Sequence, residues 1–435
     1  MTSQTPQTLS AYPSDRSAWF ALILLILAVL LAFIDRQVLA LLVEPVKADL
    51  SLTDTQIGLL QGPAFALFYA LAALPLGWMV DSTNRRNLII AGMVVWSAAT
   101  IGCGLAPSFG WMFLARIGVG VGEACLIPAV FSLIPDLFRP DRRATAFGAY
   151  VASALLGASL AMIFGGIAIG WLDSHDSIMF GLQESWRQTF VVVGLPGFIL
   201  AAAYFLMREP ARQEVSGAGT GFAEAFAHVK RHAKPFAYAA LGLSAIGALA
   251  QSILAWLPAI LQRGYGLSPQ DAAFSLGWVV AFASIAGGLL VSRLPRWFAR
   301  WDPDRPTVTA AVAGSAAALA IGIAGWFTDT SLSVALVYGA MLLPAFAAYG
   351  LTPVLIQAMA PNEMRGRIVA VAKLLEYSAV SVVAVAVGML SDMRPGDPDG
   401  LQWATALCLL LTAVAAVIGF GLLRRSVRNE VLVQR

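Results

Sequence analysis

Charged side chains are scarce in this sequence: they make up 12% of its 435 residues, whereas hydrophobic residues make up 59%. Ordinary soluble domains carry about twice that charged fraction. The apolar residues also continue for about 20 positions at a time, the length of a helix that crosses about 30 Å of hydrocarbon. This composition excludes a soluble globular protein and predicts a chain whose main solvent is lipid.

Histidine and cysteine are equally scarce, with three of each. The histidines lie in polar loops, and the cysteines lie inside apolar segments without the spacing of a metal site. We therefore expect no metal, no cofactor and no histidine proton relay. The net charge of +3 comes from basic residues scattered over short loops, so we expect no nucleic-acid partner. These six residues are His175, His228, His232, Cys103, Cys125 and Cys408.

Apolar runs and turn signals divide the chain into twelve predicted spans, six on either side of a polar stretch. The spans are residues 18–43, 56–80, 88–105, 111–135, 144–171, 188–207, 236–261, 271–294, 307–327, 332–358, 366–390 and 401–423. The polar stretch contains a predicted amphipathic helix over 222–232. The predicted domains are tails 1–17 and 424–435, six-helix halves 18–207 and 235–423, and a linker 208–234.

The distribution of lysine and arginine predicts the orientation, because basic loops stay on the cytoplasmic side. If the N-terminus is cytoplasmic, only Lys47, Arg187, Arg263 and Arg394 fall in outer loops. The first apolar run is too long for a cleaved signal peptide and should remain as a span. We expect an integral multi-pass cell-membrane protein, in the inner membrane if bacterial, with both termini cytoplasmic.

Residues 77–86 read GWMVDSTNRR, with a glycine, an acid four residues later and a basic pair. This segment resembles the signature loop of major facilitator transporters. Orientation signals alone explain the arginines but not Gly77 and Asp81. The resemblance implies an all-α membrane protein with the major facilitator fold, twelve transmembrane helices in two pseudo-symmetric halves. The predicted gating residues are Gly77, Asp81, Arg85, Arg86, Asp136 and Arg142, which form a cytoplasmic latch in the outward-facing state.

Three further segments narrow the resemblance: FIDRQVL at 33–39, RIGVGVGEA at 116–124 and ESWRQTF at 184–190. Together they resemble the spinster-like branch, whose members are linked with export of lysophospholipids and sphingosine phosphate. The resemblance implies functional residues at Asp35, Arg36 and Glu123. The fifth span lacks the Gly-Pro pair typical of drug–proton antiporters, so that motif does not support an antiporter.

Several ionisable residues lie inside the predicted spans, where each charge costs at least about 2.5–3.5 kcal/mol unless it has a partner or a watery cavity. Arg36 and Glu123 come from two spans that border the central cavity of a facilitator, and we predict that they form an ion pair. A proton on Glu123 would then release Arg36 to bind an anionic headgroup. Glu123 and Asp35 are the predicted proton-coupling residues, with protons as the coupling ion.

Arg36, Glu123, Arg116 and Glu376 are the predicted substrate-binding residues. A purely structural role is open for each of them: Arg36 and Glu123 would neutralise each other and lock their helices, and Arg116 would be a structural partner. Lys373 and Glu376, three residues apart on one helix, can also neutralise each other locally.

The predicted function is proton-coupled transport of an amphiphilic, lipid-like solute by alternating access, in a monomer whose partners are membrane lipids and the solute. The alternative transporter is an organic-anion or sugar-acid proton symporter. A non-transporting lipid-binding receptor is the alternative from another class. An enzyme is not expected, because no nucleophile, base or metal cluster lies at membrane depth.

Overall fold

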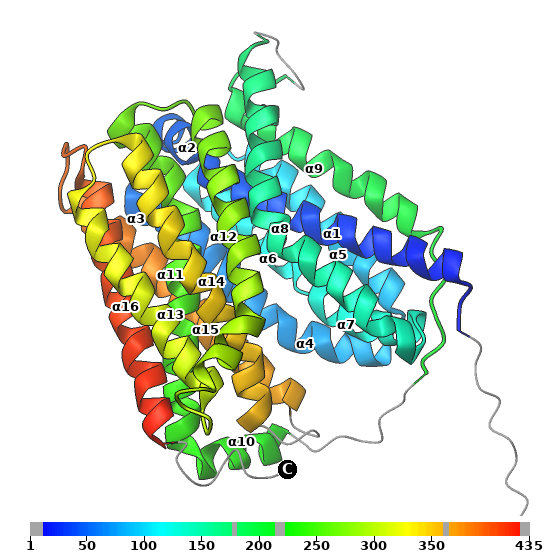
Figure 1. Ribbon diagram of the computed structural model, residues 1–435. Helices are drawn as coiled ribbons and strands as arrows, with labels where there is room; N and C mark the ends of the chain where they lie inside the picture. Colours follow the sequence, from blue (N-terminus) through cyan, green and yellow to red (C-terminus); the bar gives the residue numbers. More distant parts are fainter. Residues whose placement is uncertain (1–11, 176–180, 214–221, 360–364, 427–435) are drawn as a thin grey trace, which may run out of the picture.

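The computed structural model describes residues 12–175, 181–213, 222–359 and 365–426 (Figure 1). These residues contain twelve helical spans long and apolar enough to cross a membrane. Each overlaps one predicted span, so the twelve-span prediction is confirmed. The predicted tails and linker lie partly outside the described residues, but the amphipathic helix of the linker is present as α10 (Phe222–Arg231).

The helices of the N-terminal half are α1 (Asp15–Leu41), α2 (Val43–Asp49), α3 (Asp54–Gln61), η1 (Gly62–Leu67), α4 (Phe68–Ser82), α5 (Arg85–Gly104), α6 (Phe109–Glu123), α7 (Leu126–Leu137), α8 (Pro140–Asp173) and α9 (Ser185–Tyr204). Those of the C-terminal half are α11 (Ala233–Tyr265), α12 (Pro269–Phe298), α13 (Pro306–Ala324), η2 (Gly325–Phe327), α14 (Ser331–Met359), α15 (Arg365–Asp392) and α16 (Gly400–Ser426).

Two spans of the N-terminal half are interrupted, which the sequence analysis did not predict. The second span changes from α3 into the π-helix η1 and then into α4. The fourth span breaks between α6 and α7. A proline follows each change: Pro63 has no N–H for the carbonyl of Leu59, and Pro128 has none for the carbonyl of Ala124. Each missing hydrogen bond lets the helix change its path inside the membrane.

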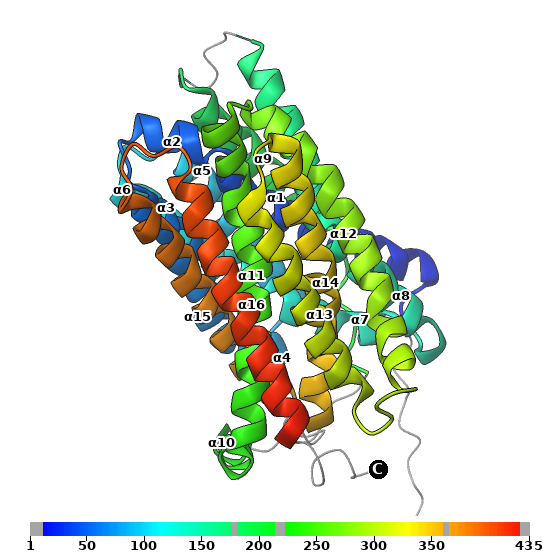
Figure 2. The ribbon, with the colours of Figure 1, turned by 60° about the vertical axis from the view of Figure 1, so that its left-hand side comes forward.

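The two halves meet closely at one end of the molecule and lean apart toward the other (Figure 1). Because the number of spans is even, the first and last described residues lie on the same face of the molecule, which we call the terminal face. Helix α2 lies on the opposite face, which we call the α2 face. Contacts between the halves join α3 and η1 to α15, α1 to α11, and α8 to α12. Figure 2 shows α11 beside α16, its main partner within the C-terminal half.

Close helix packing depends on glycine where α5 crosses α6. A Cβ added to Gly92 would lie 2.5 Å from the carbonyl oxygen of Gly122 and 2.5 Å from Sγ of Cys125. A Cβ on Gly122 would in turn lie 2.7 Å from the backbone nitrogen of Trp96. The two backbones therefore touch at this crossing, as small residues allow in membrane helices.

We expect Gly92→Ala to lower the free energy of unfolding by about 1–3 kcal/mol, because the new methyl group has no space without a shift of backbone. The thermal midpoint of the purified protein in detergent measures the effect. Gly148→Ala in α8 is the matched control, since nothing lies within 4 Å of a Cβ added there. Equal midpoints for the two variants would contradict the packing argument.

Candidate functional site

An ion pair between two spans lies at the centre of the candidate site. Nε of Arg36 on α1 donates to Oε2 of Glu123 on α6 at 2.7 Å. The Glu123 side chain is 0% exposed and that of Arg36 is 16% exposed. The predicted pairing of these two residues is therefore present, and Arg36 is its accessible member.

The break in the fourth span sets the position of Glu123. Glu123 is the last residue of α6, and the helix resumes as α7 at Leu126. At the break, the N–H of Ala124 bonds only weakly to the carbonyl of Val121, at 3.4 Å. Oε1 of Glu123 is buried and has no hydrogen-bond partner within the described residues. The carboxylate thus uses one oxygen for Arg36 and holds the other unbonded.

Aromatic rings surround the Arg36 guanidinium. Its Cζ lies 5.1 Å from the ring centres of Phe65 and Tyr69 and 5.6 Å from that of Phe33. The faces of such rings attract cations. These rings come from α1, η1 and α4, so the interrupted second span supplies two of the three.

Asp35 and Arg116 lie behind this pair and are both buried. Arg116 donates to two backbone carbonyls, those of Leu60 and Asp35, both at 3.4 Å. Neither carboxylate oxygen of Asp35 makes a hydrogen bond within the described residues. The Thr100 hydroxyl is the neighbouring donor, but its geometry falls short of a hydrogen bond. Arg116 therefore supports the backbone of α1, while Asp35 is a buried acid without a hydrogen-bonded partner.

The C-terminal half carries a second charged cluster. Nζ of Lys373 donates to Oε2 of Glu376 and to the hydroxyl of Tyr349, each at 2.8 Å. The Tyr349 hydroxyl donates to Oε1 of Glu376 at 2.7 Å. The expected pairing of Lys373 with Glu376 is present, and Tyr349 on α14 is a third member of the cluster that the sequence did not indicate.

Two tyrosines connect the charged groups of the two halves. The rings of Tyr69 on α4 and Tyr377 on α15 lie 5.0 Å apart, centre to centre. Tyr69 also contacts the Arg36 guanidinium, and Tyr377 lies one helical turn from Lys373. The six predicted intramembrane charges therefore form two clusters, one in each half, on either side of this aromatic contact.

A network of charges closes the α2 face, and the sequence analysis did not predict it. Asp54 accepts from Nη1 of Arg263 at 2.7 Å, from Nζ of Lys47 at 2.5 Å and from the hydroxyl of Ser391 at 2.6 Å. Arg263 also pairs with Glu44 at 2.7 Å. Because Arg263 and Ser391 belong to the C-terminal half, this network joins the halves.

Backbone contacts reinforce that closure. The carboxylate of Asp392 accepts from the backbone N–H groups of Asp54 at 2.9 Å and Thr55 at 2.8 Å, at the N-terminus of α3. A Cβ added to Gly58 would lie 2.5 Å from the carbonyl oxygen of Ala384, and one added to Gly388 would overlap the backbone of Asp54. We call this set of contacts the α2-face closure.

Within the described residues, the hydrogen bonds of the signature segment stay in the N-terminal half and the start of the linker and do not reach the C-terminal half. Arg85 is buried and forms ion pairs with Asp136 and with Glu209, the latter at 2.7 Å. Glu209 also accepts from the backbone N–H of Arg86 at 2.9 Å. Asp81 is exposed and makes no hydrogen bond within the described residues, and nothing lies within 4 Å of a Cβ added to Gly77. The predicted latch of the outward-facing state stays a prediction, and Glu209 is a partner that sequence reasoning missed.

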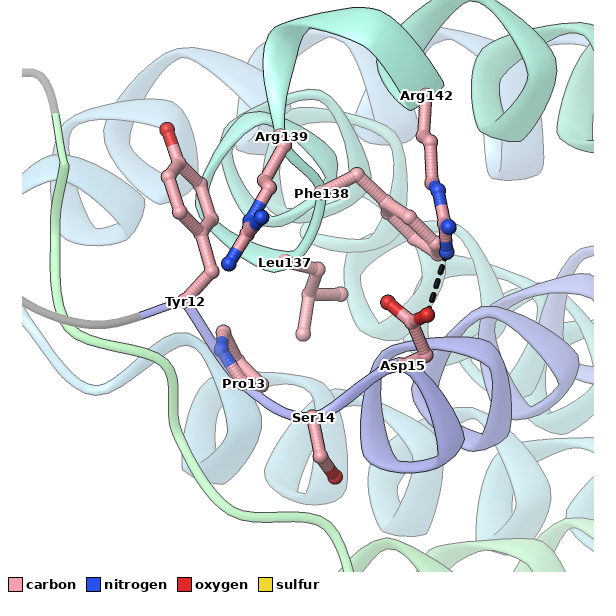
Figure 3. Close-up of a pocket in the computed structure, with 8 residues that line it drawn as sticks. All are labelled: Tyr12, Pro13, Ser14, Asp15, Leu137, Phe138, Arg139 and Arg142. Atoms are coloured by element: carbon pink, nitrogen blue, oxygen red, sulfur yellow. Dashed lines mark hydrogen bonds and ion pairs between the residues drawn. The ribbon is translucent and has the colours of Figure 1, made fainter.

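Arg142, the remaining predicted gating residue, lies at a surface pocket of about 200 Å³ on the terminal face (Figure 3). It pairs with Asp15 at 2.6 Å, and both side chains are largely exposed. Asp15 precedes Arg36 by 21 residues of α1, or about 31 Å of helix. This pocket is therefore remote from the Arg36–Glu123 pair.

Comparison with known proteins decides the family. The profile of the Major Facilitator Superfamily matches residues 25–384. The chain belongs to this superfamily. Its family and fold are those of transporters rather than enzymes. Within the described residues, no three histidine, cysteine or acidic side chains gather as a metal site would require.

Several facilitators are similar over almost the whole chain. An MFS-type efflux pump of Mycolicibacterium smegmatis is 28% identical over 420 residues, which are 92% of this chain and 91% of that protein. The probable L-galactonate transporter of Escherichia coli is 24% identical over 94% of this chain and 90% of its own length. The inward-facing, unoccupied structure of a bacterial homolog of the human lysosomal transporter Spinster matches with a TM-score of 0.80 and 27% identity, covering 96% and 98% of the two chains. The spinster-like resemblance is thus confirmed.

Neutralising Asp54 should weaken the α2-face closure of this facilitator, because Arg263 and Lys47 would lose their shared carboxylate. We introduce Ser381→Cys as a reporter and expect Asp54→Asn to raise, several-fold, the rate at which a membrane-impermeant maleimide labels it. Ser381 is buried in the wild-type structure, and its backbone would meet a Cβ added to Gly62. Such ionic hydrogen bonds contribute about 1.5–3 kcal/mol each.

Asp302→Asn is the control for this measurement. It removes an ion pair with Arg424, at 2.9 Å, that lies within the C-terminal half alone. The three native cysteines are buried and should contribute little background. If the two variants label position 381 at the same rate, the charges at Asp54 do not hold the halves together.

Proposed function

We propose that this facilitator is a proton-coupled transporter of an amphiphilic solute with an anionic headgroup, such as a lysophospholipid or a sphingosine-phosphate-like lipid. The observation that carries the proposal is the 2.7 Å contact between Arg36 and Glu123, which joins two spans in the interior. Arg36 binds the headgroup, and Glu123 and Asp35 exchange protons. The other two predicted substrate residues support the site indirectly, Arg116 through the backbone of α1 and Glu376 through Lys373. The resemblance to the spinster-like branch supports the lipid-like solute, and a spinster homolog is among the similar structures.

Competition for Arg36 couples the two ligands. Burial opposes the charge of Glu123, while the neighbouring guanidinium favours it. A proton on Glu123 removes its attraction for Arg36, which is then free to pair with a substrate oxyanion. When Arg36 binds the substrate, the ionised carboxylate of Glu123 loses its partner and becomes less stable. Binding of the substrate therefore favours binding of the proton, and binding of the proton favours binding of the substrate.

The position of the α2-face closure supports an alternating-access cycle. We propose that the terminal face is cytoplasmic, as the lysine and arginine distribution predicts, and that the chain acts as a monomer of two halves, 18–207 and 235–423. On this orientation the closed α2 face is outside and the structure is inward-facing. Return to the outward-facing state would break the Arg263–Asp54 pair and form the predicted latch at Asp81.

An organic-anion or sugar-acid symporter is the second candidate, favoured by the similarity to the L-galactonate transporter over 94% of this chain. The surroundings of Arg36 favour an amphiphile instead. Its neighbours are Phe33, Phe65 and Tyr69, whereas a sugar acid needs many hydrogen-bonding side chains for its hydroxyl groups. A lipid-binding receptor is the candidate from another class, and it would bind solute without moving it.

Transport in proteoliposomes tests the proposal. With a pH gradient, the wild-type protein should drive a labelled lysophospholipid across the membrane, with up to about tenfold accumulation per pH unit for one proton per solute. Glu123→Gln should abolish the gradient dependence but leave counterflow exchange, because the amide cannot exchange a proton. Glu184→Gln, which changes an exposed carboxylate outside the spans, should behave as the wild type.

Three outcomes would overturn parts of the proposal. Gradient-driven transport in the Glu123→Gln variant would assign proton coupling to another residue. Transport of labelled galactonate but not of lysophospholipid would select the sugar-acid alternative. Saturable binding without counterflow of either solute would identify a receptor.

A further inference from the structure

One face of α15 contacts the N-terminal half along most of its length. Gly388 lies against the backbone of Asp54, Ala384 against Gly58, and Ser381 against Gly62. Tyr377 continues the row with its contact to Tyr69. These positions are three or four residues apart and therefore share one side of the helix.

Lys373 is the next position on this face, one turn closer to the terminal face. Its side chain is 41% exposed, whereas that of its partner Glu376 is 4% exposed. Val371 and Leu375 are exposed apolar residues of α15, as a lipid-facing side would carry. Each is two residues from Lys373 and so points about 160° away from it. The exposed surface of Lys373 therefore faces the space between the halves, where their contact ends.

Hydrogen bonds from the described part of the chain hold the Lys373 ammonium group in place without using all of its donors. Two of its three N–H groups bond to Glu376 and to Tyr349, and the ring of Tyr349 lies 4.9 Å from Nζ. Both oxygens of Glu376 are already hydrogen-bonded, one to Lys373 and one to Tyr349. The remaining donor of Lys373 is the polar group that this cluster offers to a ligand.

We propose that Lys373 is a second oxyanion-binding residue, supplied by the C-terminal half, and that Glu376 and Tyr349 position it. This inference rests on the proposed function, in which Arg36 binds the same anionic group from the N-terminal half. The ligand is a solute whose head is an oxyanion with several acceptor oxygens, a phosphate or a carboxylate. Glu376 is then a positioning residue rather than a substrate contact.

The charge balance of the two clusters supports this assignment. Arg36 is paired with Glu123, and Lys373 with Glu376, so each cluster is neutral before a ligand arrives. Each cation is also the more exposed member of its pair. An oxyanion between the halves would therefore meet two cations first, with the carboxylates behind them. Because one cation belongs to each half, such a ligand would connect the halves through its own oxygens.

Replacing and then restoring the charge tests the proposal. Binding of lysophosphatidate and of galactonate to the purified protein is measured for wild type and Lys373→Cys, with uncharged monoacylglycerol as the comparison ligand. We expect Lys373→Cys to weaken binding of the oxyanion about tenfold or more, as loss of a charge-assisted hydrogen bond implies. Aminoethyl methanethiosulfonate, which attaches an ammonium group to the new thiol, should restore most of the affinity.

Matched controls separate charge from structure. Methyl methanethiosulfonate attaches a neutral group and should not restore binding; the wild type, whose three cysteines are buried, should respond to neither reagent. Monoacylglycerol binding should change less than twofold in every variant. If Lys373→Cys fails to fold, the double variant Lys373→Gln with Glu376→Gln keeps the cluster neutral and should show the same loss of oxyanion affinity. Lys373→Arg should retain the affinity within about threefold.

The outcomes distinguish this inference from the proposed function. Unchanged oxyanion affinity in Lys373→Cys, or equal recovery with the neutral reagent, would overturn the role of Lys373 and leave transport by the Arg36–Glu123 pair intact. If wild type binds neither lysophosphatidate nor galactonate, the proposed function fails, and the role of Lys373 fails with it. If Lys373→Cys loses affinity for only one of the two ligands, that ligand carries the headgroup that the site accepts.

Discussion

The energetic cost of charge inside a membrane organises this molecule. Arg36 and Glu123 each require a partner at membrane depth, and each finds it on the other span. Their pairing fixes α1 against α6 near the break that ends α6 at Glu123. In the proposed function, an exchange of partners at this contact changes which groups are neutralised, so the same interaction responds to protons and to anions.

Closure between the halves depends on a different chemistry. Around Asp54 the charges are paired at the edge of the membrane, and below them glycines let α3 and α15 touch through backbone. Deeper in the molecule the contact becomes aromatic, between Tyr69 and Tyr377, and beyond it Lys373 is exposed. Ionic, backbone and aromatic contacts thus follow one another from the α2 face to the middle of the spans.

Much of this architecture was predictable from local sequence. Hydropathy locates all twelve spans, because a helix that crosses the membrane needs about 20 apolar residues and makes its backbone hydrogen bonds within itself. The scarcity of intramembrane charge, together with the resemblance to facilitators, predicts the Arg36–Glu123 pair. The Asp54 network was not predictable, because its partners Arg263 and Ser391 are more than 200 residues away and each sits in an ordinary loop-end sequence. Glu209 and Tyr349 were also missed, because their partners lie on other elements, 124 residues away for Glu209 and 24 to 27 residues away for Tyr349.

The row of contacts along α15 constrains the variation that this helix can tolerate. Near Gly388 and Ala384 the opposing backbone leaves no room for a larger side chain. Sequence variation at these two positions should therefore be confined to the smallest residues. Tyr377 instead fills its place with a ring that contacts Tyr69, and the side chain of Lys373 is 41% exposed. Homologous facilitators that carry different solutes should therefore diverge mainly at the open end of this face, while its closed end retains the same small residues.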